Sequence, residues 1–281
     1  MNALEIKNLN KAYKGFRLNN ISFALPKGCI MGLIGENGAG KSTTIKLIMN
    51  TIGRDSGEIA VLGKDNRKNF KETKEDIGIV LDEAYYPEQM TVLQINKFLK
   101  YSYKNWEEDR FFAYLKDFGL PEKKAFKEFS RGMKMKLAIA AAMSHKAKLL
   151  ILDEATSGLD PMARDEILDI FNEFTRDEEH TILISSHIVS DLEKLCDYIT
   201  FLHKGELLFS EEKDRLLEEY AIMHCGKEDI KNIPKELILG RRVSAYGADL
   251  LVKRSSGFKQ YPLDKAGIED IILLMIKEGA A

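Results

Sequence analysis

Excess charge of either sign is missing from this chain of 281 residues. Lysine and arginine (42 residues) nearly balance aspartate and glutamate (44 residues), and the formal net charge is -2. A near-neutral chain has no general attraction for nucleic acid, so we expect no nucleic-acid partner. Cysteine is scarce too: Cys29, Cys196 and Cys225 are scattered, which argues against a disulfide framework or a zinc site and favours a reducing cytosol.

Long hydrophobic runs are also missing. The longest, such as Leu137 to Met143, fall well short of the roughly 20 apolar residues that cross a bilayer. The first residues lack the basic segment and apolar run of a secretory signal. These absences predict a cytoplasmic chain that does not itself span a membrane. With 44% hydrophobic residues, the chain can still bury the core of one large domain with a small appendage.

The pattern of apolar residues predicts an α/β fold. Glycine and proline turns separate short strands before residue 35, which indicates an antiparallel β layer. Within residues 84–146 the apolar residues recur mostly at helical spacing, which indicates a helical insert. After residue 148, strands and helices alternate, as is typical of a parallel sheet with crossover helices. We predict a main domain over residues 1–215 and a small α+β extension over 216–281, whose apolar last helix favours docking over disorder.

A glycine-rich segment predicts a phosphate-binding loop. The residues from Gly35 to Ser42 fit the pattern G-x-x-x-x-G-K-S/T, and they follow a strand and open a helix, as this motif requires. Inward-pointing N–H groups would hold phosphate oxygens, Lys41 would contact the β- and γ-phosphates, and Ser42 would ligate Mg²⁺. The alternative is a chance glycine-rich turn. The predicted nucleotide-binding residues of this loop are Gly35, Asn37, Gly38, Ala39, Gly40, Lys41, Ser42 and Thr43.

Two acids follow the apolar strand Leu149 to Leu152. Asp153 and Glu154 would lie at the carboxyl end of a strand, which is where open α/β sheets bind ligands. We expect Asp153 to hold Mg²⁺ through its water shell and Glu154 to activate the attacking water as general base. An acidic pair that only forms a turn is the alternative.

With these motifs and three more, the chain resembles the ABC (ATP-binding cassette) ATPases from Leu4 to about Ser210. Ser157 to Asp160 matches the family's D-loop, His187 matches its switch histidine, and Phe129 to Met133 stands at its L-S-G-G-Q signature. The fold that the resemblance implies is a P-loop NTPase of ABC type, with a mixed/parallel sheet core.

The resemblance also implies a head-to-tail dimer in which ATP lies between the phosphate loop of one subunit and the signature of the other. Ser130, Gly132 and Asp160 would then serve nucleotide binding, and His187 would stabilise the γ-phosphate. Tyr13, near the end of the first strand, would stack on adenine. The alternatives are an N-cap for Ser130, a surface histidine for His187 and a cross-strand aromatic for Tyr13.

The sequence departs from the family pattern at two places. Asp82 stands where most relatives have a glutamine, and it can still offer an oxygen to Mg²⁺, although it can also simply cap a turn. The signature reads S-R-G-M, with Arg131 and Met133; this resembles exporter ATPases such as that of the phenol-soluble modulins. Arg131 would add a cation close to the expected γ-phosphate, although a solvent-facing arginine is the plainer interpretation. We expect Tyr85 and Tyr86 to contact a membrane subunit.

These features predict an ATPase subunit that energises a membrane transporter, and the resemblance favours an exporter. Its cofactors would be ATP and Mg²⁺, and its partners a separate transmembrane permease and a second cassette, either a copy of this chain or a paralogue. Binding to that permease would hold the chain at the inner face of the membrane. The alternative is a soluble ABC ATPase of repair, translation or Fe-S assembly.

Overall fold

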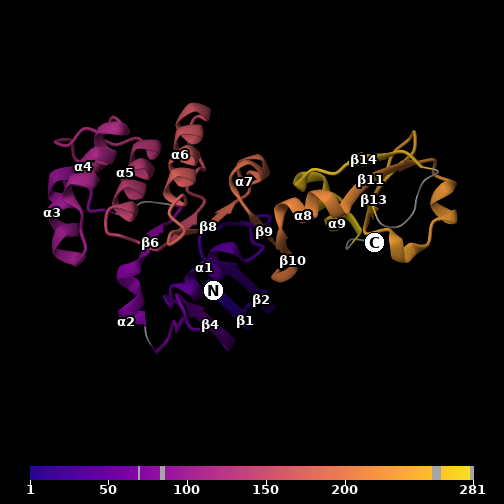
Figure 1. The fold of residues 1–281 in the computed structure, drawn as a ribbon, viewed down its shortest axis with the longest axis horizontal. Helices are drawn as coiled ribbons and strands as arrows, with labels where there is room; N and C mark the ends of the chain where they lie inside the picture. The colour runs from indigo at the N-terminus through magenta and orange to yellow at the C-terminus, as the bar shows by residue number, and fades with distance from the viewer. Residues whose placement is uncertain (69, 83–85, 255–260, 279–281) are drawn as a thin grey trace.

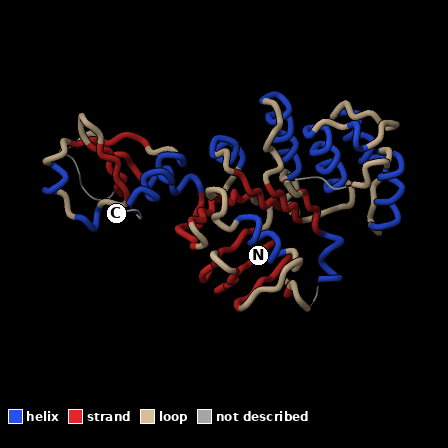
Figure 2. The backbone as a smooth tube through the Cα atoms, turned by 180° about the vertical axis from the view of Figure 1, so that it is seen from behind, coloured by secondary structure: helices blue, strands red, loops and turns tan. Residues whose placement is uncertain are grey.

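The computed structural model describes residues 1–68, 70–82, 86–254 and 261–278. Three sheets organise them (Figures 1 and 2). The first is antiparallel and has the strand order β2-β1-β4-β5. Its strands are β1 (Asn2–Tyr13), β2 (Phe16–Pro26), β4 (Ser56–Val61) and β5 (Lys64–Asp65). This is the predicted antiparallel layer.

The central sheet has the order β10-β9-β3-β8-β7-β6, and its strands are parallel except for β10. Its strands are β3 (Ile30–Ile34), β6 (Ile77–Val80), β7 (Leu149–Asp153), β8 (Thr181–Ser186), β9 (Tyr198–His203) and β10 (Glu206–Glu212). The crossover helices are α1 (Lys41–Ile48), α6 (Pro161–Phe174) and α7 (Val189–Leu195). The mixed, mainly parallel core predicted from the alternating pattern is confirmed.

The two faces of the central sheet belong to two different cores. Leu149 and Ile151 of β7 pack with the antiparallel layer and α1, whereas Leu150 and Leu152 pack with the helices of the opposite side. Successive side chains of a strand point to opposite faces, so one apolar run fills both cores. In Figure 1, α1 and β1 lie on one side of this sheet, and α5, α6 and α7 lie on the other.

A helical insert separates β6 from β7. It contains α3 (Val92–Ser102), α4 (Glu108–Asp117) and α5 (Arg131–Met143), and the short helices α2 (Phe70–Thr73), η1 (Lys74–Asp76) and η2 (Phe126–Glu128) flank or join these elements. The helices of the insert are interrupted near residues 104 and 120. Thr91 and Gln94 form a capping box at the start of α3. Within the part of the chain that the structure describes, no helix is long and apolar enough to cross a membrane.

The C-terminal extension is an antiparallel sheet that is packed against the main body. Helix α8 (Lys213–Glu219) leads into it, so the predicted boundary at residue 215 falls inside a helix. The remaining elements are β11 (Tyr220–Cys225), η3 (Asp229–Asn232), η4 (Lys235–Leu237), β12 (Gly240–Val243), β13 (Ala248–Lys253), β14 (Leu263–Lys265) and α9 (Ile268–Glu278). Ile268 and Ile271 of α9 share a core with Leu192 and Leu195 of α7, so the last helix is docked.

A charged cluster joins the four strands of this extension. The ring of His224 on β11 lies 2.8 Å from Asp249 on β13 and 3.1 Å from Asp264 on β14, and Arg242 also bonds Asp249. The hydrogen bonds to Asp249 and then to Asp264 raise the pKa of His224 above its ordinary value. Both ring nitrogens can donate to these carboxylates only when the imidazole is charged.

We predict that His224 stabilises the fold more at low pH. Because its pKa is higher in the folded chain than in the unfolded one, the contribution is fully present below about pH 6.5 and is lost as the pH rises through the folded value. Urea unfolding of the wild type and of His224→Gln, at about pH 6 and about pH 9, measures the contribution of His224 to the free energy of unfolding. The difference in free energy of unfolding should be larger at the lower pH; an equal difference would contradict the assignment.

Candidate active site

The loop between β3 and α1 needs its glycines. Gly38 and Gly40 have positive φ angles of 85° and 112°, which disfavour other residues. A Cβ atom on Gly35 would stand 2.5 Å from the carbonyl oxygen of Leu202, so the backbone there passes too close for a side chain. The loop therefore curls over the start of α1, where unpaired N–H groups favour an anion.

Lys41 is the first residue of α1, and its side chain turns back into this loop. It is only 6% exposed, and its ammonium donates to the carbonyl oxygen of Gly35 at 2.7 Å. The same ammonium lies 3.4 Å from Oε1 of Glu154. A buried lysine needs such partners, because an unpaired charge away from water is costly.

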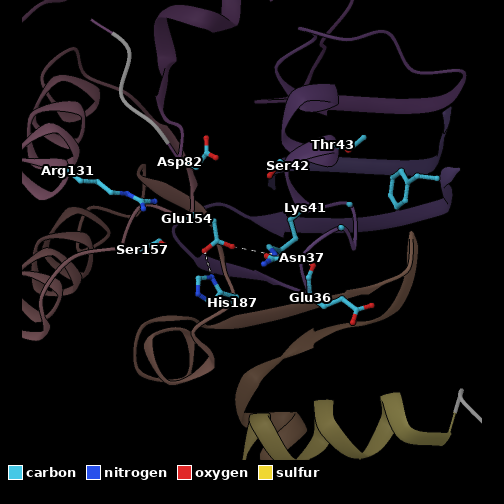
Figure 3. A pocket seen from close by; sticks show the side chains of 13 residues that line it. Glu36, Asn37, Lys41, Ser42, Thr43, Asp82, Arg131, Glu154, Ser157 and His187 are labelled. Atoms are coloured by element: carbon cyan, nitrogen blue, oxygen red, sulfur yellow. Dashed lines mark hydrogen bonds and ion pairs between the residues drawn. The ribbon is translucent and has the colours of Figure 1, made fainter. Parts of the chain in front are cut away.

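Glu154 connects the two halves of the site. Its Oε2 lies 2.6 Å from Nδ1 of His187, so one carboxylate contacts both Lys41 and His187 (Figure 3). Its φ angle is 52°, in the left-handed region, which costs a non-glycine residue about 1–3 kcal/mol. The N–H of Glu154 donates to Ser185 of the neighbouring strand at 3.1 Å, which fixes this turn.

Asp153 points a different way from Glu154. It is buried, and its carboxylate accepts a hydrogen bond from the hydroxyl of Ser185. Its oxygens and the hydroxyl of Ser42 are the donors that Mg²⁺ prefers, and Asp82 lines the same region. Among the described residues, no group of three or more His, Cys, Asp or Glu could hold a metal alone.

A cavity of about 530 Å³ lies among Lys41, Glu154 and His187, and the buried Asp153 does not line it. The cavity is bordered by the phosphate loop, the end of β6, the start of α5 and the segments that follow β7 and β8. Figure 3 labels side chains from each of these segments. The lining of the cavity is made of Phe16, Glu36, Asn37, Gly38, Gly40, Lys41, Ser42, Thr43, Asp82, Arg131, Glu154, Ser157 and His187. Most of the phosphate loop, Glu154, His187 and Asp82 are thus brought together as the sequence predicts.

Three predicted nucleotide-binding residues of the signature and D-loop, Ser130, Gly132 and Asp160, do not line this cavity. Ser130 caps α5 by accepting the N–H of Met133, and Gly132 packs against Leu159. Asp160 caps α6, and the N–H groups of Ala163 and then of Met162 hold its pKa below the ordinary value. Capping and nucleotide binding use the same geometry for Ser130, so the two roles are compatible.

Tyr13 is not among the residues that line the cavity, whereas Phe16 is. Tyr13 is 46% exposed, with the ammonium of Lys11 5.4 Å from its ring centre. The two aromatics are cross-strand partners at the β1–β2 turn, so they share one face of the hairpin. Sequence reasoning missed Phe16 and did not single out Glu36 or Ser157, whereas it had already placed the charge of Arg131 near the γ-phosphate. The hairpin turn Lys14-Gly15 was the available signal for Phe16.

Comparisons with known proteins agree with this geometry. A family model described as ABC transporter matches residues 18–157. The lantibiotic transport ATP-binding protein SrtF of Streptococcus pyogenes is 37% identical over 215 residues, which cover 75% of this chain and 91% of that protein. The bacitracin transport ATP-binding protein BcrA of Bacillus licheniformis is 34% identical over 241 residues, which cover 83% of this chain and 74% of that protein.

The chain belongs to the ABC transporter ATP-binding proteins. A solved structure titled as the ATP binding subunit of an ABC transporter has a TM-score of 0.71 and 30% sequence identity. The match covers 76% of this chain and 91% of the chain in that structure. This ABC ATPase therefore hydrolyses ATP as the energising subunit of a transporter and works with a transmembrane permease.

A buried network ties the D-loop of this ABC ATPase to the helix after His187. The carboxylate of Asp191, on α7, accepts a hydrogen bond from the hydroxyl of Thr156 at 3.1 Å. Nε of Arg164, on α6, lies 3.7 Å from the same oxygen, and its guanidinium donates to the carbonyl oxygen of Leu159. Asp191 is the third residue of α7, which starts two residues after His187, so the network connects the segment that follows Glu154 to the segment that follows His187.

We predict that Asp191→Ala lowers the free energy of unfolding by about 1–3 kcal/mol, because it leaves the hydroxyl of Thr156 without its buried acceptor and the guanidinium of Arg164 without its counter-ion. Asp165→Ala is the matched control: it removes an exposed ion pair with Lys194 between the same two helices, at 3.5 Å. That change should cost no more than about 0.5 kcal/mol. Urea unfolding measures both, and equal small losses would show that the network does not stabilise the junction.

Proposed function

We propose that this chain is the ATPase subunit of an exporter and acts as a head-to-tail dimer at the inner face of the membrane. The observation that carries the catalytic part is the carboxylate of Glu154, placed between the ammonium of Lys41 and the ring of His187. The exporter assignment is supported by the relatives, whose names refer to lantibiotic and bacitracin transport, and by the S-R-G-M signature.

The phosphates of ATP would occupy the loop from Gly35 to Thr43. Its N–H groups would bind the phosphate oxygens, and Lys41 would contact the β- and γ-phosphates. Ser42, Asp153 and Asp82 would hold Mg²⁺, which neutralises phosphate charge and orients the chain of phosphates for attack. Gly35 and Ala39 would shape the loop rather than face the ligand, because Ala39 is buried in the core.

Glu154 would accept the proton of the attacking water. Its carboxylate lines the cavity, where the attacking water would lie, and its left-handed backbone directs it there and away from Asp153. His187, hydrogen-bonded to Glu154 through Nδ1, presents its other ring nitrogen for the γ-phosphate. The bond from the γ-phosphorus to the bridging oxygen breaks, and ADP and phosphate result.

The base of ATP would stack on the aromatic pair of the β1–β2 hairpin, Tyr13 and Phe16. Phe16 lines the phosphate cavity, and Tyr13 lies opposite it on the same face. The exposure of Tyr13 leaves its ring available for a flat ligand.

For the permease contact, the structure favours α3 over the predicted tyrosines. Tyr86 packs edge-on against Phe126 at 5.5 Å, and Tyr85 lies outside the described residues. Phe98 and Tyr101 on α3 are 54% and 82% exposed. Exposed aromatics at i and i+3 are typical of a binding surface for a partner helix.

We predict that Glu154→Gln lowers the steady-state rate of ATP hydrolysis about 100-fold or more, because the amide cannot accept the proton. Its affinity for ATP should stay within about threefold, since the phosphate loop is unchanged. Phosphate release and equilibrium ATP binding measure the two quantities. Glu58→Gln, which changes an exposed acid on β4, is the control. Unchanged hydrolysis in Glu154→Gln would remove Glu154 from the general-base role.

We predict that Tyr13→Ala and Phe16→Ala each weaken ATP binding about 3- to 10-fold through lost stacking on the base. Inhibition of ATPase activity by inorganic tripolyphosphate, which has no base, should be the same in both variants and in the wild type. If Phe16→Ala also weakened tripolyphosphate, its role would be to shape the phosphate loop.

A further inference from the structure

The arginine at the start of α5 faces the cavity of its own chain. Arg131 lines that cavity together with Lys41 and Glu154, and its side chain extends from α5 toward them (Figure 3). It belongs to the segment that the family resemblance places against the nucleotide of the partner subunit. We propose that Arg131 instead contacts the terminal phosphates of the ATP bound to its own chain. This inference rests on the proposed function, in which ATP occupies the loop from Gly35 to Thr43.

The position of Arg131 is defined by its contact with the D-loop. A Cβ atom on Gly158 would stand 3.2 Å from Nε and 3.4 Å from Cζ of Arg131, so the guanidinium lies directly over this glycine. Gly158 has a φ angle of 76°, and the absence of a side chain there lets the guanidinium approach. The next residue of α5, Gly132, packs at ordinary van der Waals distance from Leu159. The start of α5 is thus packed on residues 158–159, and Arg131 is directed over them into the cavity.

The charges of the cavity leave Arg131 available to a ligand. Lys41 already contacts the carbonyl oxygen of Gly35 and the carboxylate of Glu154. Arg131 makes no hydrogen bond or ion pair with any residue in the described ranges. The acids that line the cavity are Glu36, Asp82 and Glu154. ATP adds further negative charge at the loop, and a planar guanidinium with five donors suits the oxygens of a phosphate.

The neighbours of Arg131 do not share its direction. Successive residues of a helix point about 100° apart, since a turn contains 3.6 residues. Ser130 and Gly132 do not line this cavity, and Ser130 turns its hydroxyl to the N–H of Met133. The first turn of α5 can therefore serve two nucleotides at once: Arg131 that of its own chain, and Ser130 with its neighbouring amides that of the partner. Such an arrangement would link both sites to the helical insert.

Nucleotide binding to the monomer separates the two possible sites of action. The full chain is diluted until light scattering gives a monomer, and mant-ATP and mant-ADP are titrated by fluorescence with Mg²⁺ present. Arg131→Ala should weaken mant-ATP about 10-fold, the loss expected for one charge-assisted contact, and should weaken mant-ADP by less than about threefold. Arg131→Lys, which keeps the charge without the planar fork, should fall between the wild type and Arg131→Ala.

Lys134→Ala is the matched control, because Lys134 is on the same helix but its ammonium lies 4.8 Å from the ring centre of Phe126 and outside the cavity lining. It should leave both affinities unchanged. Two results with Arg131→Ala would overturn the proposal. If its affinity for mant-ATP were unchanged and its ATPase activity were lost only where dimers form, Arg131 would act at the partner's site. If neither the affinity nor the activity changed, Arg131 would face solvent. Failure of the wild type to bind mant-ATP would instead overturn the proposed function.

Discussion

Three parallel strands, β3, β7 and β8, end at one level of the central sheet, and the register between them decides which side chains meet. Ile34 pairs with Ser186, and Asp153 pairs with Ser185. The phosphate loop, Glu154 and His187 each follow directly after one of these ends. A shift of one residue in either pairing would turn the apolar runs of the strands to the wrong faces, so the two cores on either side of the sheet fix the register and, with it, the site.

The same edge must hold two adjacent carboxylates and a buried lysine without leaving any charge unpaired. The left-handed backbone of Glu154 solves this problem, because it separates the two acids. Asp153 stays in the sheet with the hydroxyl of Ser185, and Glu154 turns toward Lys41 and His187. The local strain is offset by the ion pair, by the hydrogen bond to His187 and by the N–H bond to Ser185. The resulting carboxylate is fixed in place and faces the cavity, which suits a general base.

The sequence predicts the parts of the site that depend on local motifs, and it fails where contacts are distant. The phosphate loop and the acidic pair combine few residues at fixed spacing with a strand before them, so Lys41, Ser42 and Glu154 were found. Phe16 was missed because its place depends on hairpin pairing with Tyr13. Arg131 and the Thr156–Asp191–Arg164 network depend on how the helical insert and α7 pack on the D-loop, and no local pattern encodes that packing. Phe98 and Tyr101 look like core residues by spacing alone, since apolar periodicity does not distinguish a buried face from a binding surface.

The position of ATP is the central claim, and a crystal structure of the Glu154→Gln variant with Mg²⁺ and ATP tests it most directly. The account predicts phosphates in the loop from Gly35 to Thr43, Lys41 beside the β- and γ-phosphates, and Mg²⁺ on the hydroxyl of Ser42. Ser130 of a second copy should then lie across the same γ-phosphate. ATP bound elsewhere, or phosphates out of reach of Lys41, would contradict the account.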